Sequence, residues 1–325
     1  MRCYTPAMRM ILSHISALEF WRSALSDAGL AREQCRAISL PSAAIPARSV
    51  RDHPLVRCGT LSLPVHVLAL ENRRSGATLA IHKVRPLPAG SFRAVSLPGC
   101  AEPIFVTCPE LTLVHVAGIM SFARLIHLGL EFCGTFAPDE SRLYGLRTRE
   151  PLTSPEKIAS FVHKIEDVHG AKIVRTALPH LLSGSASPRE STLAELLTLP
   201  YLHGGSKFEH PAMNAVIPIP ARSRWTTNRS SLRCDLLWPD KRVAVEYDST
   251  LCHTGAERIA DDASRKNTLE ALGFTVVTAT WKQVENYQEY NRFAQILAKH
   301  LRTRIRPTCS DYPARQFALR RELLG

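Results

Sequence analysis

Three acidic residues lie close together in a predicted β-hairpin of the C-terminal third. Asp235 stands near the end of one strand-like run, and Glu246 and Asp248 end the next, Val243–Asp248. Side chains alternate across a strand, so Glu246 and Asp248 share a face, and a hairpin can bring Asp235 beside them. Clustered carboxylates raise one another's pKa, and a hard divalent cation relieves that repulsion. We predict that Asp235 and Glu246 bind Mg²⁺ or Mn²⁺; the competing interpretation places Asp248 in a turn and pairs Glu246 with an arginine.

Two further residues are candidates for the same site. Glu190 follows Ser187-Pro-Arg, which fits a capping box, and it also lies at the rim of an apolar helical face from which it could reach the sheet. His253 follows Asp248 after a short loop; it suits a general base, a metal or phosphate contact, or simply an exposed loop position. The predicted catalytic residues are Glu190, Asp235, Glu246, Asp248 and His253.

A predicted helix over residues 257–272 carries a charged stripe that contains Arg258, Asp262 and Arg265. Arg265 could clamp a phosphate, or it could form an i,i+3 ion pair with Asp262. We expect a mixed role in which Asp262 orients Arg265 towards the site. The residues predicted to contact the substrate are Arg258, Arg265 and Lys266.

The elements that must position these residues follow the order α-β-β-β-α-β-α beyond residue 187. The turn of the hairpin is predicted at Trp238-Pro-Asp-Lys241, because proline suits a turn corner. This order predicts an α/β sandwich with a mixed sheet. Apolar periodicity and capping residues place helices at 188–199, 257–272 and 287–301 and strands at 214–219, 232–237, 242–247 and 274–279.

The N-terminal part shows a different, α+β pattern. Ser183-Gly-Ser-Ala-Ser-Pro188 is the strongest linker signal in the chain. We therefore predict an N-terminal α+β domain over residues 1–183, a second domain over 187–305 and a tail over 306–325. The expected helices of the first part are 13–30, 109–132 (which two glycines could divide), 155–169 and 171–182, and its expected strands are 65–70, 77–84 and 103–107.

Composition restricts the class of protein. The 325 residues suggest about two domains, and 45% hydrophobic with 22% charged residues is the composition of globular proteins. The net charge of +12 favours a polyanionic partner such as DNA, although frequent arginine alone would also produce it. Nine scattered cysteines without a Cys-x-x-Cys pair argue against a disulfide framework or a zinc finger. The apolar runs are too short for a membrane span, so we expect a cytoplasmic protein without a membrane partner.

The motifs of the C-terminal third together resemble the Vsr-like endonuclease domains of the PD-(D/E)xK restriction-endonuclease superfamily. The resemblance covers about a third of the chain, and it implies a restriction-endonuclease-like fold with a magnesium-dependent DNA-cleaving core that contains the five catalytic candidates. Ser249 stands where the family commonly has glycine, and Asp248 stands where the superfamily has lysine, whose charge Lys266 or His253 would have to supply. The motifs are Ser-Pro-x-Glu190, Cys234-Asp-Leu-Leu-Trp-Pro, Val-Glu246-x-Asp248 with His253, Asp262-x-x-Arg265, Leu269 and Gly273-Phe.

Two short motifs stand out in the N-terminal part, Ser13-His-x-Ser-Ala-Leu and Val106-Thr-Cys-Pro-Glu-Leu-Thr-Leu. Through them this part resembles AbiEi-type antitoxin and regulator proteins, and the resemblance implies a small DNA-binding module beside a mixed α/β domain. Three interpretations remain open: a metal-dependent DNA endonuclease of phage defence or repair, a non-catalytic DNA-binding regulator that keeps a nuclease scaffold, and a structural or protein-interaction module. DNA is the expected partner, with a homodimer or a toxin–antitoxin pair as further possibilities.

Overall fold

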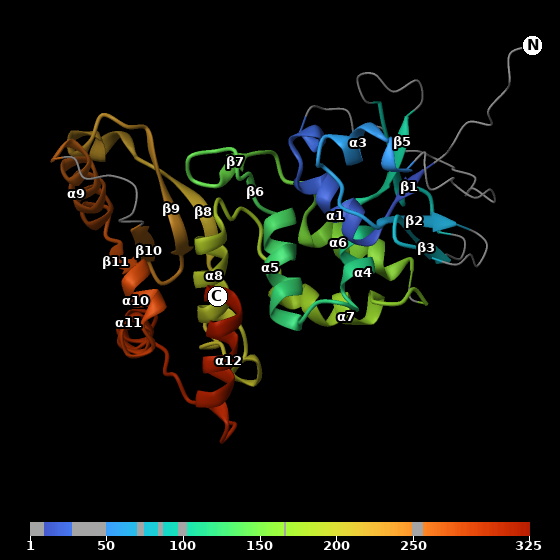
Figure 1. The fold of residues 1–325 in the computed structure, drawn as a ribbon. Helices are drawn as coiled ribbons and strands as arrows, with labels where there is room; N and C mark the ends of the chain where they lie inside the picture. The colour runs from blue at the N-terminus through green and yellow to red at the C-terminus, as the bar shows by residue number, and fades with distance from the viewer. Residues whose placement is uncertain are drawn as a thin grey trace, which may run out of the picture. The chain divides into compact units, whose positions relative to one another are not determined.

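A computed structural model describes residues 10–27, 50–69, 75–83, 87–96, 103–165, 167–248 and 256–325. The chain folds as two compact units (Figure 1). Unit 1 comprises Met1–Leu125 and Phe136–Pro179, and unit 2 comprises Ile126–Thr135 and His180–Gly325. Each unit contains helices and a sheet with both parallel and antiparallel neighbours, which confirms the predicted α/β class.

A five-stranded mixed sheet forms the centre of unit 1. Its order is β3-β2-β1-β5-β4, with parallel pairing of β1 to β5 and of β2 to β3. Two of the strands were not predicted; β1 is only two residues long, too short for a visible alternation of apolar and polar residues. The strands are β1 (Ile11–Leu12), β2 (Val65–Ala69), β3 (Leu79–Lys83), β4 (Phe92–Val95) and β5 (Ile104–Thr107).

The helices of the N-terminal half begin largely where capping residues predict them. The apolar run 109–132 is two helices, and the break lies at Gly118, which closely approaches His169: a Cβ there would lie 2.7 Å from Nε2 of that histidine. A two-stranded sheet of β6 (Phe136–Pro138) and β7 (Leu146–Thr148) follows. The helices are α1 (His14–Arg22), η1 (Ala24–Ser26), α3 (Pro54–Arg57), α4 (Pro109–Val116), α5 (Phe122–Phe132), α6 (Pro155–His163), α7 (Ala171–Ala177) and η2 (Leu178–His180).

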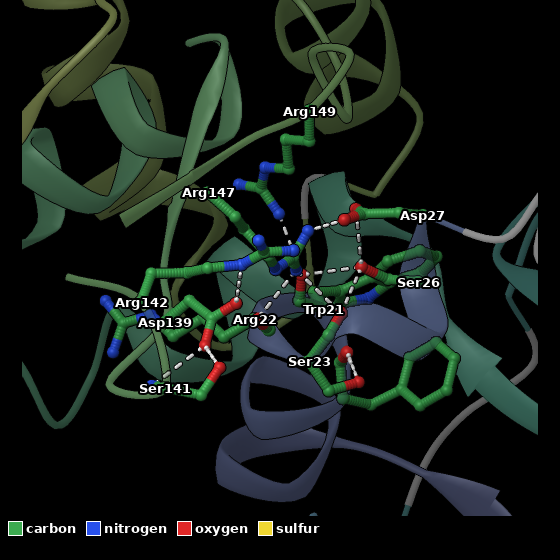
Figure 2. Close-up of polar contacts among 11 residues, drawn as sticks. Trp21, Arg22, Ser23, Ser26, Asp27, Asp139, Ser141, Arg142, Arg147 and Arg149 are labelled. Carbon is green, nitrogen blue, oxygen red and sulfur yellow. Dashed lines mark hydrogen bonds and ion pairs between the residues drawn. The ribbon is translucent and has the colours of Figure 1, made fainter. Parts of the chain in front are cut away.

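Two arginines of the β7 region satisfy the carbonyl groups at the C-terminal end of α1 (Figure 2). Arg147 donates to the carbonyl oxygens of Arg22 and Ser23 at 2.8 and 2.7 Å, and it forms an ion pair with Asp27. Arg149 donates to the carbonyl of Trp21 at 2.7 Å. The last carbonyls of a helix have no partner within the helix and carry its negative dipole end, so the two cations stabilise this terminus.

From residue 188 on, the described part of unit 2 contains the α-β-β-β-α-β-α order that the sequence predicts, with two additional α-helices and two short 3-10 helices. Its four-stranded sheet has the order β11-β10-β9-β8, in which only β10 and β11 are parallel. The elements are α8 (Pro188–Thr198), η3 (Tyr201–His203), β8 (Ala212–Pro218), η4 (Ala221–Thr226), β9 (Ser231–Trp238), β10 (Val243–Asp248), α9 (Ala256–Ala271), β11 (Thr275–Thr280), α10 (Trp281–Glu285), α11 (Tyr287–His300) and α12 (Tyr312–Leu324).

Alternating side chains bury both faces of this sheet. Cys234 and Ala244 belong to a core cluster that Leu269 of α9 completes, so α9 covers one face. Val243 and Val245 alternate with Ala244 and are also buried, on the other face. On the helical side of unit 2, α11 is joined to α8 by a hydrogen bond of 2.7 Å from the Tyr290 hydroxyl to the carbonyl of residue 196.

Two segments differ from the predicted domain plan. The supposed linker 183–188 lies within unit 2, where Ser185 is fully buried and its carbonyl accepts the Thr135 N–H at 2.7 Å. Residues 306–325, predicted as a tail, contain α12, which packs against α8 and η3 and buries Tyr312 and Leu319. Serine and glycine indicated flexibility at the supposed linker, but their small side chains instead allow close packing.

Candidate active site

A pocket of about 390 Å³ in unit 2 brings together most of the residues predicted for catalysis and substrate binding. One wall is formed by the end of β10 and by residues within β9 and β11, and the other by α9. Asp235, Glu246 and Asp248 face two predicted substrate contacts, Arg265 and Lys266, across it. The remaining lining residues are Tyr247, Asp262, Ala263, Leu269, Val276 and Thr278.

Asp235 occupies an interruption of the sheet. The β8–β9 ladder pairs the residues on either side of it but omits Asp235 and the residue opposite, Asn214, which adopts a left-handed conformation with φ of 49°. The β9–β10 ladder stops at the pair of Leu236 and Val245, so it does not include Asp235 or Glu246. The Asp235 carboxylate accepts the Tyr247 N–H at 2.7 Å in place of a backbone carbonyl. Such irregularities redirect side chains, and they are frequent beside active sites.

The two carboxylate oxygens of Glu246 have different surroundings. Its Oε2 accepts a hydrogen bond of 3.0 Å from Nη2 of Arg265, which also donates to the carbonyl of Arg233 at 2.9 Å. Its Oε1 is buried and has no nitrogen or oxygen donor in the described part of the chain, although the Cys234 thiol, a weak donor, interacts with the carboxylate and lowers its pKa. A buried carboxylate oxygen without a donor is costly, so this atom is the clearest indication of a missing ligand.

The electrostatics of the pair follow from burial and mutual repulsion. Burial raises the pKa of Asp235 to about 7, with further contributions from the negative charges of Glu246 and Glu190. Burial also raises the pKa of Glu246, although Arg265 opposes this effect. Two carboxyl groups that resist ionisation beside each other are characteristic of functional sites and are stabilised by a cation.

We expect Asp235→Asn to change how the stability of unit 2 depends on pH. Because the folded-state pKa of Asp235 is raised, the wild type loses stability relative to the variant as the pH rises from about 4 to about 7, and the difference is constant above that. After allowance for partial exposure, the loss should be about 1–3 kcal/mol. Urea unfolding of both proteins at pH 4.5, 6 and 8 without divalent cations measures it, and parallel pH profiles would contradict the assignment.

Glu190 serves the start of α8. Both of its carboxylate oxygens have protein donors: Oε2 accepts the Ala186 N–H at 2.9 Å and the Asn214 amide at 2.5 Å, and Oε1 accepts the Ser187 hydroxyl at 3.0 Å. Ser187 in turn caps the helix by accepting the Glu190 N–H at 3.2 Å. The cap by Ser187 is therefore present as predicted, but Glu190 accepts the N–H of Ala186 where a capping box would use that of Ser187. Glu190 does not line the pocket, although its charge acts on Asp235.

Some of the other predicted residues line the pocket, and others lie outside the residues that the structure describes. Asp248 and Lys266 are exposed pocket residues, and Nζ of Lys266 lies 4.0 Å from Oε1 of Glu270. His253 and Ser249 lie outside the described residues, as does the side chain of Arg258. Asp262 lines the pocket, but the described ion pair of Arg265 is with Glu246.

The chemistry of the donor set fits a hard cation with few protein ligands. Within the described ranges, no three histidine, cysteine, aspartate or glutamate side chains converge on one point. Asp235 and Glu246 line the same pocket, and the charge of Glu246 acts on Asp235. Mg²⁺ typically uses one or two carboxylates and completes its shell with waters and phosphate oxygens. The Oε1 atom of Glu246, which has no nitrogen or oxygen donor among the described residues, is available as a ligand for such a cation.

A cluster of four histidines, which no sequence motif indicates, lies in unit 1. The His14 ring stacks on His82 and His115 at centroid distances of 3.6 and 4.4 Å, and Nδ1 of His66 lies 2.9 Å from Nε2 of His82. Burial and the neighbouring rings lower the pKa of His14 to about 2 and that of His115 to about 3. The four histidines come from separate elements that are far apart in the sequence, so no motif could reveal the cluster.

We expect this cluster to make unit 1 sensitive to acid. Because the folded-state pKa values lie below the ordinary value of 6.5, the unfolded chain takes up protons first, and stability is lost as the pH falls below about 6.5. Glu19 opposes the effect only at His66. Between pH 7.5 and 5.5 the loss should be about 1–3 kcal/mol. Thermal unfolding should show a smaller loss for His14→Asn than for the exposed control His163→Asn; equal losses would contradict the prediction.

The comparisons with known proteins leave the family of the chain open. No protein-family model matches it, and no solved structure matches it significantly. An uncharacterized protein of Mycobacterium tuberculosis, found in two strains, is 38% identical over 69 residues. The match covers 21% of this chain and 25% of that protein, so the chain spans only about a quarter of the relatives' length. Among the described residues, no helix has the length and apolarity that crossing a membrane requires.

Proposed function

We propose that unit 2 is a metal-dependent DNA endonuclease domain of the restriction-endonuclease-like class. The observation that carries the proposal is that two partly buried carboxylates, Asp235 and Glu246, line one pocket, and that a buried oxygen of Glu246 has no nitrogen or oxygen donor among the described residues. The resemblance of the surrounding motifs to Vsr-like domains supports the choice of DNA, as does the net charge of +12.

Asp235 and Glu246 would hold Mg²⁺ or Mn²⁺ in this site. A bound ion of this kind supplies an activated water and neutralises charge on the phosphodiester. Arg265 fixes the Glu246 carboxylate through its 3.0 Å contact, and its link to the Arg233 carbonyl keeps that contact aligned with the sheet. The Tyr247 N–H holds the Asp235 carboxylate in the same way.

Lys266 is the best candidate for the positive charge that the superfamily places on a strand lysine. It lies in the same pocket as Asp248, the residue that stands at the position of that lysine, and its side chain is about half exposed. An ammonium group there attracts the phosphate of a DNA strand. Asp248 is exposed at the pocket and can accept a proton from water.

A non-catalytic DNA-binding regulator is the second candidate. The ion pair between Arg265 and Glu246 favours it, because the arginine already neutralises part of the carboxylate charge. Such a protein would bind DNA with strong salt dependence and leave it intact. For both candidates we propose DNA as the partner and the cytoplasm as the location.

Plasmid nicking separates the two candidates. The full chain is incubated with supercoiled plasmid in Mg²⁺, in Mn²⁺ and in EDTA, and the nicked and linear forms are separated on a gel. Conversion that requires the divalent cation supports the nuclease. Salt-sensitive retention of the plasmid without conversion in either cation supports the regulator. If the plasmid is neither converted nor retained, both candidates are refuted.

A further inference from the structure

Trp225 is an exposed aromatic side chain on the connection between β8 and β9. It lies on η4 with 82% of its surface accessible, whereas Trp21 and Trp238 are each only 3% exposed. Single exposed apolar residues are common on protein surfaces, so exposure alone does not indicate a ligand. Two further observations indicate a ligand: the segment around Trp225 is basic, and it contacts the helix α9 that lines the candidate active site.

The segment around Trp225 is strongly basic. Arg222 and Arg224 precede it, both are exposed, and neither is paired with a carboxylate in the part of the chain that the structure describes. Between Glu209 and Asp235 the sequence contains four arginines and no acidic residue. An aromatic ring that follows two unpaired arginines in an exposed turn is suited to a nucleic acid, since bases stack on the ring and phosphates attract the cations.

This segment is fixed to the helix that forms a wall of the candidate active site. Arg229 contacts both carboxylate oxygens of Asp261 at 2.8 Å. The Thr268 hydroxyl lies 3.3 Å from the carbonyl oxygen of Thr226 and shares its one proton between that acceptor and the carbonyl of Ser264 at 2.9 Å. Thr268 and Asp261 are direct sequence neighbours of the pocket residues Leu269 and Asp262 on α9. A strand bound at Trp225 would therefore lie next to the pocket.

We propose that the segment 221–230 is a binding site for unpaired DNA, in which Trp225 stacks on a base and Arg222 and Arg224 contact phosphates. The inference rests on the proposed function, because it assumes that DNA is the ligand. Unpaired DNA is favoured over an intact duplex because a ring can stack only on a base whose face is free. η4 is also a six-residue turn, much shorter than the helices that read the major groove.

Binding measured without cleavage tests the proposal. A fluorescently labelled 12-nucleotide oligo(dT) is titrated with the full chain carrying Glu246→Gln in EDTA, and anisotropy gives the Kd. Trp225→Ala should weaken binding about 5- to 50-fold, and Trp225→Phe should retain most of it. Arg222→Gln with Arg224→Gln should flatten the dependence of log Kd on log salt concentration. Phe317→Ala, which removes another aromatic ring that is 61% exposed, is the matched control and should bind as the parent does.

The outcomes distinguish this inference from the proposed function. Unchanged binding by Trp225→Ala, tighter binding of a blunt duplex than of the single strand, or absence of oligonucleotide binding by the parent would each overturn it. Trp225-dependent binding by a chain that never nicks plasmid would leave the inference standing and refute the nuclease. Cation-dependent nicking combined with Trp225-independent binding would do the reverse.

Discussion

Asp235→Asn and Glu246→Gln should each lower cation-dependent plasmid nicking by about 100-fold or more. Both substitutions keep the size of the side chain and remove the charge that would hold the cation. The side-chain amide oxygen of each variant can still accept the hydrogen bond that the carboxylate accepts, from the Tyr247 N–H at the first position and from Arg265 at the second. Initial rates of conversion of supercoiled plasmid in Mg²⁺ measure the effect.

Asp240→Asn is the matched control for these variants. Asp240 lies in the exposed turn of the same hairpin, outside the pocket, so its substitution should leave the nicking rate within about twofold. Far-ultraviolet circular dichroism confirms that all three variants are folded. Wild-type nicking by Asp235→Asn would contradict the assignment of the carboxylate pair, and so would an equal loss in the turn variant.

Leu269→Ala should destabilise unit 2 by about 2–5 kcal/mol. Leu269 is 1% exposed, and it is the α9 member of the core cluster that contains Cys234 and Ala244. Its truncation leaves a cavity directly beneath the helix that carries Arg265, so the variant should also nick plasmid more slowly at temperatures where the wild type is fully folded. Urea unfolding followed by tryptophan fluorescence measures the change, because Trp238 is buried in the same unit.

Ile296→Ala provides the comparison for this stability prediction. Ile296 is 53% exposed on α11, so truncation there should cost less than about 1 kcal/mol. A similar midpoint shift for both variants would show that the packing of α9 on the sheet contributes little to stability. The proposed architecture of the pocket would then lose its physical basis.

In the described parts of unit 2, local sequence patterns predict the strands and helices but not the irregularity of the sheet. Val243–Asp248 and the preceding strand were predictable because each contains a short apolar run and the turn residues Pro239 and Asp240 separate them, and the helix α8 because Ser187 precedes Pro188 and Glu190. The interruption at Asp235 was not predictable. It depends on the left-handed conformation of Asn214 in a different strand, and the sequence of β9 contains no sign of it.

The sequence by itself determined the order of helices and strands in unit 2, the pairing of acidic residues in a hairpin and the excess of positive charge. Only the tertiary structure decided that Arg265 binds Glu246 rather than Asp262, that Glu190 is occupied by the helix terminus, and that residues 306–325 pack as a helix. The physical reason is one of range. Periodicity and capping are set by residues a few positions apart, whereas the environment of a charge is set by groups that the fold brings from distant segments.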